Sequence, residues 1–256
     1  MSEQAAVLTE TRDGVLVITI NRPEARNAIN LAVAEGIAAA VDQLDETSDL
    51  RTGILTGAGS SFSAGMDLKA FVMGERPFVG DRGFAGLVQR PPRKPLIAAI
   101  EGFAVAGGFE VALACDLIVA ARDARVGIPE VKRSLVAAGG ALIRLPKRMP
   151  YHLAMELALT GDPIGAERAA ELGIVNRLAD PGAAIDVALE LAAEIARNGP
   201  LALDASKRIV SQSLDWSEQE AWQKQGEIAG PVLISEDARE GATAFAEKRD
   251  PVWKGK

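Results

Sequence analysis

Residues 95–121 read PLIAAIEGFAVAGGFEVALACDLIVAA, small and apolar residues interrupted by glycines. The uncharged segments 95–100 and 117–121 predict two buried strands, because short apolar runs are typical of parallel sheets. Between them, residues from about 108 to 114 predict a helix that begins directly after two glycines. A strand, a helix and a second strand in this order indicate an α/β architecture with largely parallel pairing.

The sequence before this stretch continues the same architecture. Residues 7–20 predict two strands joined by a turn at Arg12-Asp13-Gly14, because apolar runs on either side of Asp-Gly are typical of a hairpin. A helix is expected to start after Asn30, a favoured N-cap residue, and to end near residue 46. A short buried strand is predicted at 53–57, and the Gly-, Pro- and Arg-rich stretch 74–93 predicts a mobile loop.

The sequence after Pro129 is mainly helical in pattern. The predicted helices cover residues 140–148, 151–160, 165–172, 183–197, 200–213, 217–229 and 235–248, and one strand is expected at 173–178. We therefore divide the chain at about residue 195. Residues 1–195 form the predicted α/β core, and residues 196–256 form a helical C-terminal region.

Charge and composition exclude several classes of function. Acidic residues outnumber basic ones by 35 to 28, a net charge of −7, which argues against general nucleic-acid binding. A single cysteine, Cys115, excludes a disulfide framework and a thiolate zinc site, so we interpret it as a core thiol. A single histidine, His152, argues against a metal cluster and is interpreted as structural. We expect no metal.

The same survey predicts where the protein is found. No apolar run of about 18 residues occurs, so no membrane span is expected. Residues 1–10 carry acidic groups and lack a basic-then-apolar signal pattern. Together with the lack of disulfides, this predicts a cytoplasmic location.

Three clusters of residues could carry chemistry. Residues 57–69, GAGSSFSAGMDLK, follow a strand with small residues that let a ligand approach the backbone, or form an ordinary turn. Residues 102–110 place two glycines at a helix start, where free N–H groups suit an oxyanion, or allow close packing. Residues 127–130 end in Glu130, a catalytic carboxylate or a solvated one. Phosphate-loop and dinucleotide-binding spacings are absent.

Short motifs, some of them parts of these clusters, follow one another along the chain in a characteristic order and spacing. They are NRPEARNA at 21–28, FSAGMDL at 62–68, IAAIEG at 97–102, GGFE at 107–110, CD at 115–116, PE at 129–130, REG at 239–241 and FAEKR at 245–249. Over nearly the whole chain they resemble the enoyl-CoA hydratase/isomerase, or crotonase, superfamily. The resemblance implies an α/β crotonase-like spiral of repeated ββα units with a helical C-terminal trimerisation region.

The resemblance also implies the site. Backbone N–H groups of Met66 and Gly107 would form an oxyanion hole for the thioester oxygen. Glu110 would act as the base on water, and Glu130 as the acid that protonates C2 of a 2-enoyl-CoA. Coenzyme A belongs to the substrate, so no separate cofactor is implied. It would contact Ala25, Ala64, Asp67, Leu68, Lys69 and Lys248, the two lysines neutralising phosphates.

The leading expectation is therefore a lyase that reversibly hydrates an enoyl-CoA thioester, as a homotrimer or dimer of trimers. The alternatives are another acyl-CoA reaction, either double-bond isomerisation or thioester hydrolysis, and a non-catalytic binding protein, since some relatives bind RNA. The net charge disfavours an RNA partner. Residues 131–140 depart from the hydratase pattern, since they are one residue shorter and lack a proline. We expect this loop to change the preferred acyl group.

Overall fold

The computed structural model describes residues 5–256. Residues 1–4, part of the stretch 1–10 that was searched for a signal pattern, lie outside the described residues. Its main layer is a six-stranded sheet with the order β1-β2-β3-β6-β8-β11. The strands are β1 Val7–Arg12, β2 Val15–Ile20, β3 Thr52–Gly57, β6 Leu96–Ile100, β8 Leu117–Ala121 and β11 Arg177–Ala179. β1 and β2 form the predicted antiparallel hairpin, and all other pairs are parallel.

Helices cover both faces of this sheet. Because side chains alternate along a strand, Ile54 and Ile97 point to one face, where α7 (Ala184–Ala196) packs, and Leu55 and Ala98 point to the other. On that second face the core includes α1 (Leu31–Glu46) and α3 (Gly107–Ala114). The predicted N-cap is confirmed, since the Asn30 side chain accepts a hydrogen bond from the N–H of Val33.

A second, three-stranded sheet was not predicted from the sequence. It contains β7 (Phe103–Val105), β9 (Arg125–Gly127) and β10 (Ile164–Gly165), in the order β10-β9-β7. The chain runs from β6 to β7 and then α3, and again from β8 to β9 and the 3₁₀ helix η3 (Pro129–Arg133). Each pass places one strand in each sheet before a helix, which is the predicted ββα repeat.

Two expectations need correction. Residues 173–178 were predicted to be a strand, but β11 begins at Arg177, because the N–H groups of Gly173 and Ile174 bond back to α6 (Ala166–Glu171) and end that helix. The stretch 74–93 is a structured segment, not an open loop. It contains β4 (Phe78–Val79), the 3₁₀ helix η2 (Gly80–Arg82) and β5 (Gly83–Phe84), and it buries Arg82, Phe84 and Leu87.

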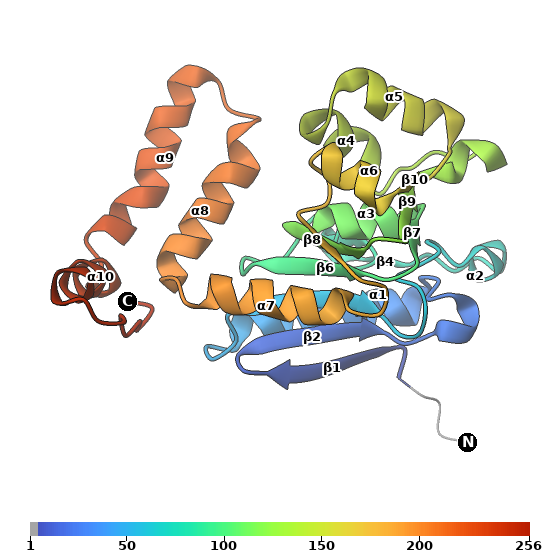
Figure 1. The fold of residues 1–256 in the computed structure, drawn as a ribbon. Helices are drawn as coiled ribbons and strands as arrows, with labels where there is room; N and C mark the ends of the chain where they lie inside the picture. The colour runs from blue at the N-terminus through green and yellow to red at the C-terminus, as the bar shows by residue number, and fades with distance from the viewer. Residues whose placement is uncertain (1–4) are drawn as a thin grey trace.

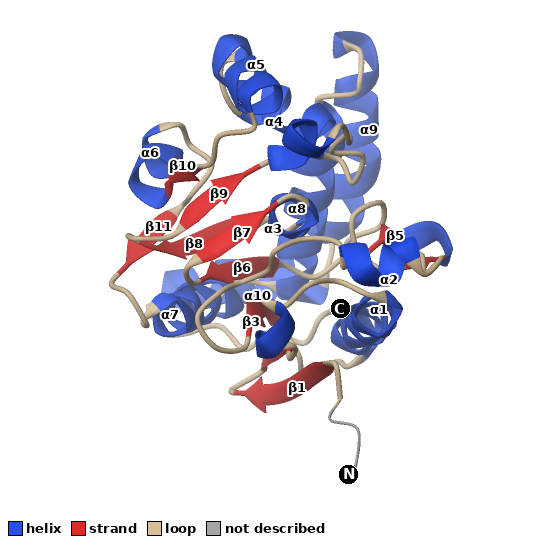
Figure 2. Ribbon diagram, turned by 90° about the vertical axis from the view of Figure 1, so that its right-hand side faces the viewer, coloured by secondary structure: helices blue, strands red, loops and turns tan. Residues whose placement is uncertain are grey.

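The remaining helices lie in two groups. The first comprises α4 (Ala141–Arg148), α5 (Tyr151–Thr160) and α6, which lie above β8 in Figure 2, whereas α7 lies below it. The second comprises α8 (Pro200–Ser213), α9 (Glu218–Leu233) and α10 (Glu236–Glu247), which stand to one side of the α/β core in Figure 1. The predicted division near residue 195 falls at the end of α7. Within the described chain, no helix is both long and apolar enough to cross a membrane.

Candidate active site

The segment 62–67 lies between β7 and the residues that precede α1. On one side, the N–H of Ser63 donates to the carbonyl of Phe103 at 3.1 Å, and the N–H of Val105 donates to the carbonyl of Ser63 at 3.1 Å. On the other side, Ile29 pairs with Met66 as an isolated parallel bridge. Because Ile29 bonds to the groups on both sides of Met66, the N–H of Met66 itself points away from Ile29.

Gly107 opens α3 on the side to which Met66 points. A Cβ on Gly107 would lie 3.4 Å from the nitrogen of Met66, and a Cβ on Gly65 would lie 2.8 Å from the nitrogen of Gly107. Gly65 also has φ +90°, so a side chain there would be strained as well as crowded. Within residues 5–256, neither the N–H of Met66 nor that of Gly107 donates to another group of the protein. Two adjacent free donors therefore stand at a helix N-terminus.

The residue before Gly107 holds an unusual conformation. Ala106 has φ 52° and ψ −133°, a region that residues with a Cβ seldom occupy. Its N–H donates to the carbonyl of Gly127 at 2.9 Å, which ties the start of α3 to β9. The Phe84 ring packs on the other side, since a Cβ on Gly107 would lie 2.6 Å from its Cζ. The donor at Gly107 is thus fixed by contacts on two sides.

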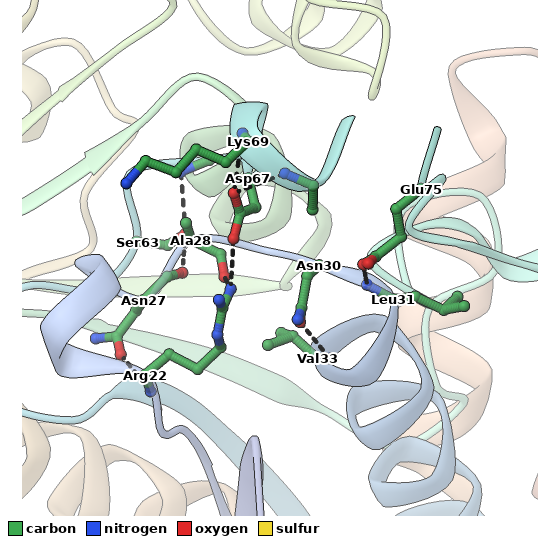
Figure 3. Close-up of polar contacts among 12 residues, drawn as sticks. Arg22, Asn27, Ala28, Asn30, Leu31, Val33, Ser63, Asp67, Lys69 and Glu75 are labelled. Atoms are coloured by element: carbon green, nitrogen blue, oxygen red, sulfur yellow. Dashed lines mark hydrogen bonds and ion pairs between the residues drawn. The ribbon is translucent and has the colours of Figure 1, made fainter. Parts of the chain in front are cut away.

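A half-buried polar network supports the Met66 side (Figure 3). Arg22 donates from Nη1 to the carbonyl of Ala28 at 2.6 Å and to Oδ2 of Asp67 at 3.0 Å. Asp67 also caps α2 (Leu68–Val72) by accepting from the N–H groups of Lys69 and Ala70. Burial acts to raise the pKa of Asp67, but these hydrogen bonds and the Arg22 charge hold it below its ordinary value. The carboxylate is therefore fully engaged, and the backbone N–H and carbonyl of Asp67 are bonded to Ile29 and Phe71.

Glu110 lies on the first turn of α3, directly after the donor at Gly107. Its side chain is 4% exposed, and Oε1 accepts a hydrogen bond from the N–H of Ala141 at 3.2 Å. Burial raises the pKa of Glu110 to about 7. The N–H of Ala141 opposes that rise, and the nearby charge of Glu130 adds to it. This carboxyl can therefore change its charge near neutral pH.

Glu130 follows Pro129 in η3. Burial raises its pKa as well, and its Oε2 is buried with no hydrogen-bond partner among the described residues. The charge of Glu130 also disfavours the ionised form of Glu110. The arrangement thus combines two N–H donors with a carboxyl pair that can give and accept protons.

The predicted coenzyme A residues fall in two places. Ala25, Ala64, Leu68 and Lys69 lie around η1 (Pro23–Ala25) and the start of α2, where the N–H of Ala64 donates to the carbonyl of Arg26 at 3.0 Å. Lys248 is exposed at the end of α10, which lies at the opposite side of the molecule from α2 in Figure 1. One copy of the chain does not bring Lys248 and Lys69 together.

The two residues interpreted as structural differ. Cys115 is buried, as predicted, and burial raises the pKa of its thiol. His152, which was interpreted as structural, is exposed on α5, with its ring edge-on to that of Tyr151 at 5.6 Å between centroids. Ala154 and Leu157 are the buried residues of α5, and the position of His152 faces outward. No group of three potential metal-ligating side chains is found within residues 5–256.

Sequence reasoning missed the residues that surround Glu110 from the loop before α4. A Cβ on Gly139 would lie 2.5 Å from Oε2 of Glu110, and Arg144 acts on Glu110 through its charge. The adjacent glycines at 139 and 140 were the available signal, because two glycines before a helix indicate a close approach of the backbone to another group. Nothing in the local pattern indicated which group that is.

Comparison with known proteins agrees with this geometry. The sequence profile of the enoyl-CoA hydratase/isomerase family matches residues 10–256. The crystal structure of enoyl-CoA hydratase EchA1 from Mycobacterium marinum superposes with a TM-score of 0.97 at 59% identity, covering 99% of this chain and 100% of that one. The chain therefore belongs to the enoyl-CoA hydratase/isomerase family, and the predicted crotonase-like fold is confirmed.

Curated relatives are named for two related reactions. Enoyl-CoA hydratase EchA19 of Mycobacterium tuberculosis is 43% identical over 251 residues, which are 95% of this chain and 94% of that protein. Carnitinyl-CoA dehydratase of Salmonella arizonae is 43% identical over 254 residues, or 96% and 97% of the two chains. Both names describe the addition or removal of water, as the sequence predicted for this chain.

Proposed function

We propose that this protein is a hydro-lyase that reversibly adds water to the C2–C3 double bond of a 2-enoyl-CoA thioester. The observation that carries the proposal is the placement of Glu110 one turn along the helix whose first N–H, at Gly107, lies beside that of Met66. The names of the relatives support the same reaction type.

Each group has a role that its position allows. The N–H groups of Met66 and Gly107 bind the thioester oxygen and stabilise the negative charge that develops on it. In other oxyanion holes each such donor contributes about 3 kcal/mol. Ionised Glu110 accepts a proton from water as the oxygen attacks C3, and protonated Glu130 delivers a proton to C2. Coenzyme A is part of the substrate, so the proposed mechanism needs no separate cofactor.

The retention of both carboxyls favours hydration over double-bond isomerisation. Moving a double bond requires one group to shift a proton, whereas adding water requires a base and an acid at adjacent carbons. The carboxyl pair also favours an enzyme over a non-catalytic binding protein. The half-buried Glu130 has a buried, unpartnered Oε2, a costly arrangement that is typical of functional sites.

The test is a panel of straight, branched and longer enoyl-CoA thioesters and the matching hydroxyacyl-CoA thioesters, assayed by mass spectrometry. We expect hydration of at least one enoyl thioester, with Glu110→Gln and Glu130→Gln each lowering kcat by about a hundredfold or more. Crotonyl-CoA reports on the loop 131–140, because a slow reaction with it and a faster one with a bulkier thioester would support the predicted change of acyl preference. Isomerised or hydrolysed products without hydration would refute the proposal.

We also propose that the chain assembles as a homotrimer or a dimer of trimers. α9 is a 16-residue helix with no buried residue, and Trp222, Ile234 and Phe245 are between 73% and 87% exposed on the α9–α10 surface. Apolar surface of this kind marks an interface. In such an assembly, Lys248 could contact coenzyme A bound to another copy, whereas it lies away from α2 of its own chain.

Sedimentation velocity tests the assembly. We expect three or six copies for the wild type and smaller species for Trp222→Glu, whereas Leu8→Glu on the exposed face of β1 serves as the control and leaves the mass unchanged. A monomeric wild type would refute the proposal. The cytoplasmic location is likewise a proposal, supported by the single, buried cysteine, and fractionation of cells that express the protein would test it.

A further inference from the structure

Arg144 joins three separate segments next to the carboxyl pair. It lies on α4, half-buried, and its Nη1 donates to the carbonyl of Gly139 at 3.3 Å. Its Nη2 donates to the carbonyl of Val88, which lies in the segment that follows β5. One guanidinium thus links α4 to the turn before it and to the segment that carries Phe84, the ring that packs on Gly107.

The turn at 139–140 lies between Arg144 and Glu110. A Cβ on Gly139 would lie 2.5 Å from Oε2 of Glu110 and 2.8 Å from its Cδ, and a Cβ on Gly140 would collide with Nη1 of Arg144. Gly140 also has φ +110°, which only glycine adopts without strain. The backbone of the turn is therefore packed on the carboxylate on one side and on the guanidinium on the other, so a side chain at either residue would displace one of these groups.

The charged groups near Glu110 come from two elements. Glu130 of η3 disfavours the ionised form of Glu110, and Arg144 of α4 favours it. Arg148, one turn further along α4, acts on Arg144, not on Glu110, and donates to the carbonyl of Leu113 at 2.7 Å. Among the described residues, Arg144 is thus the cation whose charge favours the ionised form of Glu110.

We propose that Arg144 is a positioning residue for hydration: it holds the turn 139–140 against Glu110 and keeps that carboxylate available in its ionised form. The inference rests on the proposed function in one respect, since it concerns the same carboxyl pair. A neutral donor could satisfy the two carbonyls, but only a cation also offsets the cost of an ionised carboxylate in this buried place.

The test separates charge from shape. The titration of Glu110 is followed by NMR of protein labelled with ¹³C at the glutamate carboxyl, and its signal is assigned by its loss in Glu110→Gln. We expect Arg144→Met to move the Glu110 midpoint upward by about one pH unit. Arg144→Lys keeps the charge but cannot reach both carbonyls, so its midpoint stays near that of the wild type while kcat falls by about tenfold.

Arg148→Met is the matched control, because it removes a cation from the same helix that also donates to a backbone carbonyl but does not act on Glu110, and we expect it to leave the Glu110 midpoint in place. An unchanged midpoint in Arg144→Met, or an equal shift in Arg148→Met, would overturn the inference. Should Arg144→Met fail to fold, Arg144→Gln replaces it, with the same expected shift. The NMR comparison requires no turnover, so a wild type that hydrates no thioester refutes the proposed function without deciding the role of Arg144.

Discussion

Ile29 donates its N–H to the carbonyl of Gly65 at 2.8 Å and accepts from the N–H of Asp67 at 2.9 Å, and so pairs with Met66. This pairing turns the N–H of Met66 toward Gly107. The N-terminal motif at 21–28 thereby gains a physical role at a site to which it contributes no reacting group. It ends next to Ile29. Its Arg22 donates to Asp67 on one side of Met66, and on the other side Ser63 donates from Oγ to the carbonyl of Asn27 (Figure 3).

The Arg22–Asp67 ion pair is predicted to support turnover. Arg22→Gln removes the cation that joins the carbonyl of Ala28 to Asp67, so the segment that carries Met66 loses one of its supports. Because a shift of about 1 Å in a catalytic group can cost about a hundredfold in rate, we expect kcat for the best enoyl thioester to fall by tenfold or more. Steady-state kinetics of Arg22→Gln and the wild type with that thioester measures the change in kcat.

The control for that change is Arg12→Gln, which breaks an exposed ion pair with Glu10 on β1. Exposed pairs of this kind contribute little to stability, so the control is expected to keep wild-type kinetics. Equal effects of the two variants, or a normal kcat in Arg22→Gln with intact folding, would show that the ion pair does not position Met66.

The buried Glu110 carboxyl is predicted to make stability depend on pH. Its pKa is raised from 4.5 to about 7 in the folded state, so folding favours the protonated form. The contribution of this protonation to the free energy of unfolding is fully present below pH 4.5 and is lost as the pH rises through about 7. Since one pKa unit corresponds to about 1.4 kcal/mol, the whole effect is about 3 kcal/mol.

Glu110→Gln removes this titration. We therefore expect the variant to gain stability relative to the wild type as the pH rises from 4.5 to 8, by up to about 3 kcal/mol. Urea unfolding of both proteins at several pH values and one fixed protein concentration measures the difference. A difference that does not vary with pH would mean that Glu110 has an ordinary pKa in the folded protein.

Ala106 is predicted to be a strained position. With φ 52° and ψ −133°, it bears a cost of about 1–3 kcal/mol that glycine avoids, partly offset by about 0.5–1 kcal/mol of extra chain entropy. Ala106→Gly should therefore stabilise the protein by about 1 kcal/mol while turnover stays the same, because the donors belong to Met66 and Gly107. Ala104→Gly, at a buried position of regular β7, should destabilise it. Urea unfolding decides, and a destabilised Ala106→Gly would contradict the assignment of strain.

The parts of the fold that could be predicted are those with long, uniform patterns. The strands at 15–20 and 96–100 and the helix after Asn30 each bury a continuous apolar run or stripe. The strands β7, β9 and β10 were not predicted, because they are two or three residues long. At that length an alternation of apolar and polar residues cannot be distinguished from a turn.

The candidate site divides in the same way. Glu110, Glu130, Met66 and Gly107 follow motifs, and the structure places Gly107 beside Met66 and the two carboxyls within reach of each other's charge. The role of Arg144 depends on a contact with Val88, 56 residues away in the sequence, and the role of Ile29 depends on a bridge to Met66. Such pairings are set by the packing of the whole chain, so no local pattern reports them.

The packing of Gly139 on Glu110 gives the last prediction. A methyl group at residue 139 would lie 2.5 Å from Oε2 and 2.8 Å from Cδ of Glu110, closer than nonbonded atoms approach, so the carboxylate must move. Since a displacement of about 1 Å can cost about a hundredfold, Gly139→Ala should lower kcat by that order. KM should change little, because none of the residues expected to bind coenzyme A belongs to the turn 139–140. Gly165→Ala is the matched control, since nothing lies within 4 Å of its Cβ position and its φ is −72°. Steady-state kinetics and circular dichroism of both variants decide the matter, and a wild-type kcat in Gly139→Ala would show that the position of Glu110 against this turn is not required for turnover.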